Sequence, residues 1–429
     1  MNNTEYARLS EILLAEDAGF SIAIGAHQSI GYKAILLLGN PEQKQKYLPG
    51  LASGELIAAF ALTEPSTGSD AASVKTQAVL NEAGTHYIMN GSKIWISNGG
   101  ICDVLTVFAK VPQKQADGSI KEKMSAFIVE RNFGGVKNGP PENKMGIKCS
   151  NTAEVFFEDC PIPVENLILE VGDGFKVAMD VLNNGRFGMA TGLCGTMRKC
   201  IQKSVDHAST RKQFFNTEIH HYGAIQEKIA LMNMKLYAAE SMAYLLCSSM
   251  DNKAVDYGLE AAICKIFSSE AAWWVCDESI QVLGGTGYMR STELERIMRD
   301  LRIFRIFEGT NDILRLFIAL TGIKHLGKHS LEPAKAITNK SSTINGKVNG
   351  AVWLAKHKMG FTKAEQTIDE SGSVHKELGN STLLLDKAIQ DLQFTASEMT
   401  MNYQKKIINP ENQMMISRIA DATIGIYRR

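Results

Sequence analysis

The spacing of apolar residues divides the chain into regions of different texture. Through residues 5–57 they recur at helical spacing, in LSEILLAEDAG, in YKAILLLGN and in EQKQKYLPGLAS. Gly39-Asn40-Pro41 is a helix stop followed by a new start, and the segment SIAIGAHQSIG is built mainly from small residues. The pattern predicts a helical region over 1–57.

From residue 58 the period changes to that of short strands. SVKTQAVL, HYIMNGSKIWIS, DVLTVFAKV, MSAFIVE and TAEVFFED are rich in β-branched and aromatic residues. Asn90-Gly91 stands between two alternating runs, a signal for a hairpin turn. Residues 58–165 are therefore predicted to form a small antiparallel β domain.

Helical spacing returns near residue 173 and persists through long runs with short connections, which is typical of a helical bundle over 170–322. The order of helices, strands and helices predicts an α+β, mainly α, multidomain fold. A doubly wound parallel sheet is disfavoured because strands do not alternate with helices.

The region after the bundle has a different composition. Residues 324–363 hold eight lysines and one acidic residue, Glu332, around the single apolar patch AVWLA. This composition predicts a Lys-rich linker over 323–375, and residues 376–429 are predicted to be helical again. A tryptophan among lysines is also the pattern of peripheral membrane attachment, so a solvated loop and a membrane contact are both open.

Overall composition excludes several classes. The 46 basic residues balance the 46 acidic ones, so no field favours nucleic acid. No apolar run approaches the ~20 residues of a membrane helix. The eight cysteines are scattered and are predicted to be reduced core thiols, and the nine histidines show no metal-ligand spacing.

Three stretches could carry chemistry. ALTEPSTGSD (61–70) offers hydroxyls and backbone N–H groups to a polar ligand, or is an ordinary turn. Trp95-Ile96-Ser97 could flank a flat heteroaromatic ring, or Trp95 is a half-buried sheet residue. Glu308 lies between Ile306-Phe307 and Gly309, where an apolar setting would make it a stronger proton acceptor; otherwise it is a solvent-facing loop residue. Thr310 or Asn311 could cap the next helix.

These stretches form part of a larger set of motifs, with KIWISNGG (93–100), NNGRF (183–187), STRKQF (209–214), QVLGGTGY (281–288) and FEGTNDILR (307–315). Together, the motifs make the chain resemble the flavin-dependent acyl-CoA dehydrogenases. Order and spacing fit across residues 5–320. The helical region after 320 is similar to that of the very-long-chain branch. The resemblance implies N-terminal helices, a central β domain, a C-terminal four-helix bundle and an extra helical region. It also implies partial terminal domains at 1–57 and 376–429, because family members extend further at both ends.

In this family FAD and a carboxylate remove two hydrogens from an acyl-CoA thioester. The resemblance implies that Glu308 is the base, and that the position used by some relatives is filled by Gly185. It implies substrate contacts by Ser69, Asn183, Arg186, Phe307 and Gly309. The implied FAD contacts are Phe60, Ala61, Leu62, Thr63, Glu64, Pro65, Ser66, Thr67, Gly68, Ser69, Trp95, Ile96, Ser97, Arg211, Thr310, Asn311 and Asp312, with Gln281, Val282, Leu283, Gly284 and Gly285 lent to a neighbouring subunit.

The implied partners are an acyl-CoA, electron-transfer flavoprotein and a second copy of the chain, with a peripheral contact to the matrix face of the mitochondrial inner membrane. Small residues at Ser21–Ala26 imply room for long acyl chains. The alternatives are a non-catalytic scaffold like the paralogue that assists complex I assembly, an acyl-CoA oxidase, or an inactive fragment. The resemblance implies no nucleic-acid partner and no metal.

Overall fold

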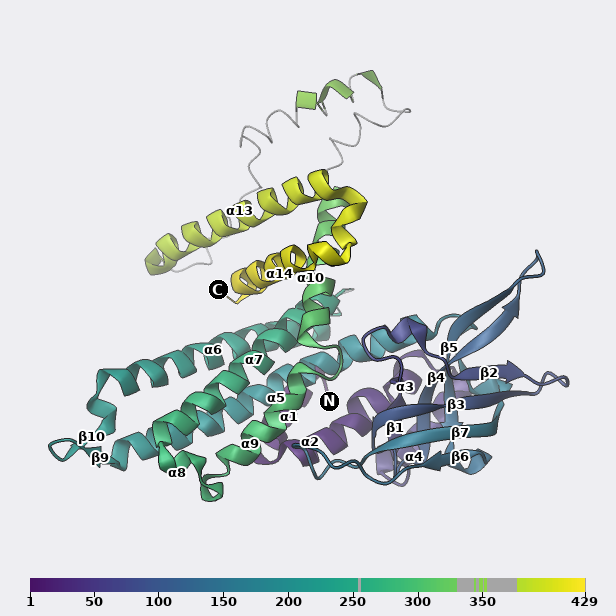
Figure 1. Cartoon of the computed structure of the whole chain (residues 1–429), viewed down its shortest axis with the longest axis horizontal. Coiled ribbons are helices and arrows are strands. Elements are labelled where there is room, and N and C mark those ends of the chain that lie inside the picture. Colours follow the sequence, from purple (N-terminus) through teal and green to yellow (C-terminus); the bar gives the residue numbers. More distant parts are fainter. Residues whose placement is uncertain (254–255, 330–342, 345–346, 350, 353–375, 429) are drawn as a thin grey trace. The chain divides into compact units, whose positions relative to one another are not determined.

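The computed structural model describes residues 1–253, 256–329, 343–344, 347–349, 351–352 and 376–428 (Figure 1). The chain divides into two compact units, Met1–Thr310 and Asn311–Arg429. Helices precede and follow one main sheet, so the α+β, mainly α, fold class is confirmed. The domain boundaries drawn from the sequence remain predictions.

The first unit begins with helices whose starts are fixed by their caps. Asn2 and Asn40 each accept a hydrogen bond from the third helical backbone N–H, and the side chain at that position bonds back. The small-residue segment is helical, and part of it is a π-helix, a form that is frequent at functional sites. The elements are α1 (Asn3–Glu16), α2 (Ala18–Gly25), the π-helix (Ala26–Gly31), α3 (Lys33–Leu38) and α4 (Pro41–Ser53).

The sheet has eight strands, with β6-β7-β3-β2-β4-β5-β8 in sequence and β1 also paired to β4. Most pairs are antiparallel, but β1 and β2 both pair with β4 in parallel, so the antiparallel prediction is only partly right. One core joins the sheet to α3, α4 and α5, and a second lies among the strands. The strands are β1 (Ala58–Ala61), β2 (Gln77–Leu80), β3 (His86–Ser97), β4 (Val104–Lys114), β5 (Ile120–Glu130), β6 (Val136–Asn138), β7 (Thr152–Pro163) and β8 (Leu167–Ile168).

The hairpin predicted at Asn90-Gly91 is wrong, because β3 runs unbroken through both residues. Its register against β7 shifts there, which makes the pair a bulge. A Cβ on Gly91 would lie 2.5 Å from Thr76 Oγ1 and 2.8 Å from its Cα. Glycine is needed because another backbone passes close by, not because the chain turns.

Three long helices lie side by side in the first unit, and α1 packs on α5 (Figure 1). The contact is close because α5 presents glycines to α1: a Cβ on Gly195 would lie 1.9 Å from Glu11 O. All eight cysteines are free; seven are buried as predicted, but Cys149 is exposed. The helices are α5 (Gly174–Thr210), α6 (Gly223–Asp251), α7 (Gly258–Leu283), α8 (Gly285–Tyr288) and α9 (Leu294–Leu301), with β9 (Lys212–Gln213) and β10 (Thr217–Glu218) between α5 and α6.

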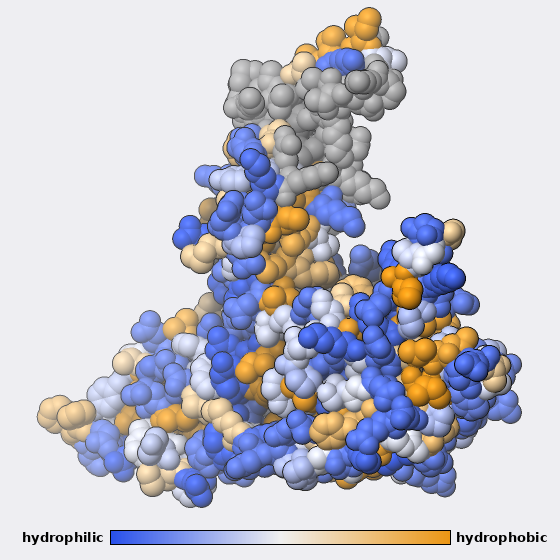
Figure 2. Space-filling view, turned by 45° about the vertical axis from the view of Figure 1, so that its right-hand side comes forward, coloured by the Kyte–Doolittle hydropathy of each residue, from blue (hydrophilic) through white to orange (hydrophobic). Residues whose placement is uncertain are grey.

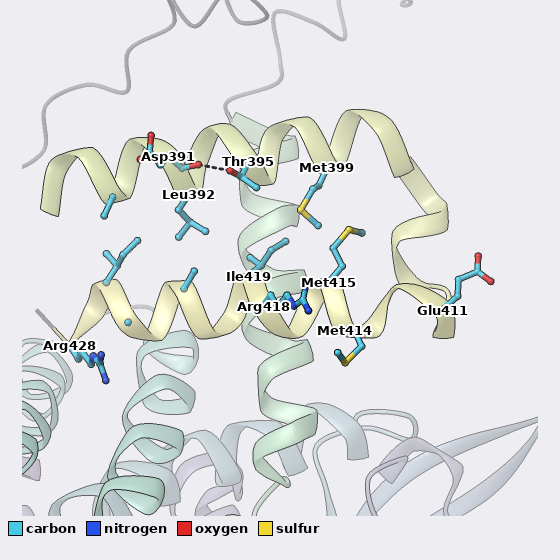
Figure 3. Close-up of a pocket in the computed structure, with 14 residues that line it drawn as sticks. Asp391, Leu392, Thr395, Met399, Glu411, Met414, Met415, Arg418, Ile419 and Arg428 are labelled. Carbon is cyan, nitrogen blue, oxygen red and sulfur yellow. Dashed lines mark hydrogen bonds between the residues drawn. The ribbon is translucent and has the colours of Figure 1, made fainter. Parts of the chain in front are cut away.

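The second unit contains α10 (Asn311–His329), α13 (Gly379–Tyr403) and α14 (Gln413–Tyr427). Arg315 Nε donates to Asp421 Oδ1 at 2.7 Å, which joins α10 to α14. A groove of about 830 Å³ lies along α13 and α14, with Leu392, Met399 and Met415 among its lining residues (Figure 3). Much of the Lys-rich linker, including Lys356, Lys358 and Lys363, lies outside the described residues. None of the described helices is both long and apolar enough to cross a membrane.

Candidate active site

The site is built around a strained turn between a 3₁₀ turn (Arg302–Arg305) and α10. Glu308 has φ +54° and the next residue, Gly309, has φ +92°. A left-handed conformation costs a non-glycine residue about 1–2 kcal/mol, so the surrounding structure must hold it. The turn points the Glu308 carboxyl inward: Oε2 is buried and has no hydrogen-bond partner among the described residues. Glu308 is therefore not the solvent-facing loop residue that the sequence left open.

Burial makes this carboxyl a stronger base than an ordinary glutamate. Loss of water disfavours the charged form and raises the pKa of Glu308 to about 7, while the nearby cations Arg186 and Lys265 act in the opposite direction. A general base is most effective when its pKa lies near the working pH. The electrostatics therefore suit proton abstraction near neutral pH.

One face of α5 meets the turn. Arg186 Nε donates to the Glu308 carbonyl at 3.2 Å, and its Nη1 donates to Asn183 Oδ1 at 2.6 Å. A Cβ on Gly185 would lie only 3.0 Å from Glu308 Oε2 and 3.2 Å from Ile30 Cγ2. Asn183, Gly185, Arg186 and Glu308 are thus brought together, and the space beside Gly185 is taken by the Glu308 carboxyl.

The turn that follows β1 is partly buried and partly open. The side chains of Phe60, Ala61 and Leu62 lie in the core of the β region, so these residues can offer only backbone to a ligand. Glu64 also points inward, where Lys93 Nζ donates to its Oε1 at 2.7 Å. The exposed residues of the turn are Pro65, Ser66, Gly68, Ser69 and Asp70, with Thr63 half-buried and Thr67 buried.

Trp95 is not the half-buried sheet residue that the sequence allowed. Its side chain is 64% exposed, and its φ is +56°. The register of β3 against β7 shifts between Lys93 and Ile96, so Trp95 stands on a bulge. Ile96 is buried and Ser97 is half-buried, which leaves the indole and the neighbouring hydroxyl available to a ligand.

Two predicted segments lie away from this group. Arg211 is the exposed residue that ends α5, and it stands 25 positions after Arg186, about 38 Å along a helix at 1.5 Å per residue. Gln281 is exposed near the end of α7, where Val282 and Leu283 are buried. Gly284 has φ +60°, and an added Cβ would meet nothing within 4 Å at Gly284 or Gly285. Their backbone is open to a ligand.

The remaining predicted residues lie on either side of the Glu308 turn. Phe307 is half-buried, with its ring 5.1 Å from that of Phe304. Thr310 precedes α10, and Asn311 and Asp312 form its first turn, so Thr310 holds the N-cap position. Sequence reasoning missed Lys265, which donates to the Gly309 carbonyl at 2.8 Å. The signal was a lysine inside the apolar run AAICKIF.

Family models described as the N-terminal, middle and C-terminal domains of acyl-CoA dehydrogenase match residues 1–55, 59–160 and 172–322. The chain is 53% identical over 426 residues to the human very long-chain specific acyl-CoA dehydrogenase, mitochondrial, covering 99% of this chain and 64% of the relative. It is 40% identical to an acyl-CoA dehydrogenase of Bacillus subtilis, covering 70% of this chain and 78% of that protein.

A solved acyl-CoA dehydrogenase from Bacillus anthracis, complexed with FAD, is 36% identical and superposes with a TM-score of 0.85, covering 100% of this chain and 70% of that one. The chain thus spans less than two thirds of the length of its human relative. The domain order, the motifs and these likenesses agree. The chain belongs to the acyl-CoA dehydrogenase family.

Proposed function

We propose that the chain is an FAD-dependent dehydrogenase that converts long-chain acyl-CoA thioesters to trans-2-enoyl-CoA. The observation that carries this proposal is the Glu308 carboxyl, which is buried, lacks a hydrogen-bond partner among the described residues and has its pKa raised to about 7. A scaffold has no use for such a base, and its strained turn would only cost stability.

The residues present fit a flavin. The exposed Trp95 ring can stack on a flat ring system, and the half-buried Ser97 lies two positions away. Thr67 Oγ1 is buried and has no partner among the described residues, as expected of a hydroxyl whose partner is a ligand. Bound FAD would supply the acceptor for the electrons that leave the β carbon.

The chain's own residues would prepare the thioester. Glu308 would take the α proton on Oε2, and its backbone N–H would donate to the thioester carbonyl, where charge develops. Arg186 supports this arrangement because it donates to the Glu308 carbonyl while Asn183 holds its guanidinium. The CoA moiety would meet Ser69, Asn183 and Arg186, with Phe307 and Gly309 beside the reacting carbons.

The helices near Ile30, whose Cγ2 lies beside Gly185, support the choice of long acyl chains. Upstream of it, Ser21–Ala26 are mainly small, and a Cβ added at Gly25 would meet nothing within 4 Å. Small side chains in this region would favour long acyl chains, because each further buried methylene adds about 0.8 kcal/mol of binding.

We also propose that the working enzyme is a homodimer. About 38 Å of helix separates Arg211 from Arg186. The Gln281–Gly285 segment follows Ser279, whose hydroxyl donates to the Cys200 carbonyl at 3.2 Å, so it lies beside the later half of α5. A second copy can supply the remote segments to a flavin held by Trp95 and the turn at 61–70.

The electron acceptor would be electron-transfer flavoprotein, and the location mitochondrial, at the matrix face of the inner membrane. The second unit supports a membrane contact. Ile344, Val348 and Val352 are exposed and recur every fourth residue along the sequence, next to the exposed Lys347. Figure 2 shows further apolar residues exposed on this unit, where α13 carries Leu383 and Leu384, each 64% exposed.

The decisive experiment is an anaerobic absorbance titration of the FAD-loaded full chain with palmitoyl-CoA. Bleaching of the flavin supports a dehydrogenase, and an unchanged flavin supports a scaffold. Adding air distinguishes a dehydrogenase from an acyl-CoA oxidase. An oxidase would consume oxygen at its turnover rate, whereas a dehydrogenase would turn over only with electron-transfer flavoprotein. Sedimentation with cardiolipin vesicles tests the membrane contact: a variant with Lys347, Lys356, Lys358 and Lys363 changed to Gln should sediment less at low salt.

A further inference from the structure

Lys265 is a fully buried lysine within α7. Its side chain is 0% exposed, and its neighbours along the helix, including Cys264 and Ile266, belong to the apolar core. Its Nζ donates to the Gly309 carbonyl at 2.8 Å, so the ammonium reaches the loop that carries Glu308. The same charge is one of two cations that act on the Glu308 carboxyl; the other is Arg186 on α5.

A buried cation is costly unless something compensates it. The other fully buried lysine of the first unit, Lys93, is compensated by an ion pair with Glu64 inside the β region and by two backbone carbonyls. Lys265 differs in that its Nζ donates to a carbonyl of the turn after Phe307. The charge is therefore placed where it acts on the reacting carboxyl.

We propose that Lys265 is a positioning residue for the base: its ammonium fixes the Gly309 carbonyl, and its charge keeps the Glu308 carboxyl ionised. This inference rests on the proposed function and deepens it. The hydrogen bond orients the Gly309–Thr310 peptide and so stabilises two consecutive left-handed residues, Glu308 and Gly309. The charge opposes the effect of burial, which otherwise favours the protonated and inactive carboxylic acid.

The two roles can be separated by substitution. Lys265→Met removes both the charge and the donor, whereas Lys265→Gln removes the charge and keeps an uncharged amide donor on a side chain that is one atom shorter than lysine. Ser268→Ala is the matched control, because Ser268 is equally buried on the same helix and its hydroxyl has no partner among the described residues.

The first readout does not depend on activity. In protein labelled with ¹³C at the glutamate carboxyls, the Glu308 resonance is assigned by its loss in Glu308→Gln and then titrated. We expect the midpoint to rise by roughly one pH unit in Lys265→Gln and Lys265→Met, equal to tenfold less carboxylate in the pH range below the midpoint. Ser268→Ala should leave it in place.

The second readout is the pH dependence of flavin reduction by palmitoyl-CoA, whose ascending limb should move upward by the same amount in Lys265→Gln. An unchanged carboxyl midpoint in Lys265→Gln would overturn the proposal, even if the variant is slow. Failure of the parent chain to reduce its flavin would instead overturn the proposed function, and the carboxyl titration would still decide the role of Lys265. If Lys265→Met does not fold, Lys265→Gln alone decides.

Discussion

The turn at 61–70 depends on an ion pair buried inside the sheet, and Lys93→Met should loosen the whole β region. Lys93 is 0% exposed, and its Nζ donates to Glu64 Oε1 at 2.7 Å, to Phe108 O at 2.7 Å and to Leu62 O at 3.1 Å. The substitution leaves the Glu64 carboxylate and two carbonyls buried without this donor. Removing one partner of a buried pair typically costs about 3–5 kcal/mol.

Glu64→Gln in the same chain should recover part of that cost. Thr76 donates to Glu64 Oε1 from its backbone N–H at 3.0 Å and from its hydroxyl at 2.6 Å, and a glutamine oxygen can accept both. The recovery is only partial because the Lys75 backbone N–H, which donates to Oε2, loses its acceptor. The double variant then buries no unpaired charge. We therefore expect it to be more stable than Lys93→Met alone, a result that additive effects cannot give when Glu64→Gln by itself is destabilising.

Hydrogen exchange of peptides from 86–97 reports the opening of β3 directly. A loss of 3 kcal/mol corresponds to exchange that is about a hundredfold faster, since about 1.4 kcal/mol is a factor of ten. Lys121→Met, at an exposed position of β5, is the matched control and should change little. Less than tenfold acceleration in Lys93→Met, or a double variant worse than the single, would refute the reasoning.

Three further outcomes follow. Burial raises the pKa of Glu308 to about 7, so between about pH 4.5 and pH 7 the folded state holds a proton that the unfolded chain has released. The stability contributed by this group is present at low pH and is lost as the pH rises through 7. In urea unfolding, Glu308→Gln should therefore be about 3 kcal/mol more stable than the parent at pH 8 and equal to it near pH 4. Gly185→Ala places a methyl 3.0 Å from Glu308 Oε2 and should slow flavin reduction at least tenfold while the FAD content stays unchanged. Gly223→Ala, where an added Cβ meets nothing within 4 Å, is the control and should not slow it. Equal rates for the two variants would show that the Glu308 carboxyl is free to move. Initial rates across saturated acyl-CoAs should peak beyond eight carbons, and a peak at or below eight would count against the long-chain assignment.

Much of the architecture could be read from periodicity. The long apolar runs became α5, α6 and α7, and the β-branched segments became strands, because burial of one face decides these elements. Asn90-Gly91 misled because a glycine that avoids Thr76 looks the same in sequence as one that makes a turn. The parallel pairing of β1 with β4 depends on contacts between distant segments, which period alone does not encode.

The site residues likewise include some that the sequence predicts and others that it does not. Glu308 could be chosen from its apolar neighbours and from family motifs. The inward-facing Glu64 and the buried Lys265 could not be identified from the sequence, because a charged side chain is expected to be exposed until its partner is known. The exposure and positive φ of Trp95 likewise come from a bulge that arises only when β3 pairs with β7.

The most direct test of the central claim is the rate of flavin reduction in Glu308→Gln. Single-turnover absorbance is recorded after mixing the FAD-loaded chain with palmitoyl-CoA, for the parent, for Glu308→Gln and for Glu227→Gln, which alters an exposed glutamate of α6. If Glu308 takes the α proton, its variant should bind FAD normally and reduce it at less than about a hundredth of the parental rate, because a general base contributes ~10²–10⁴-fold, while Glu227→Gln matches the parent. A Glu308→Gln protein that still reduces its flavin faster than that would contradict the assignment.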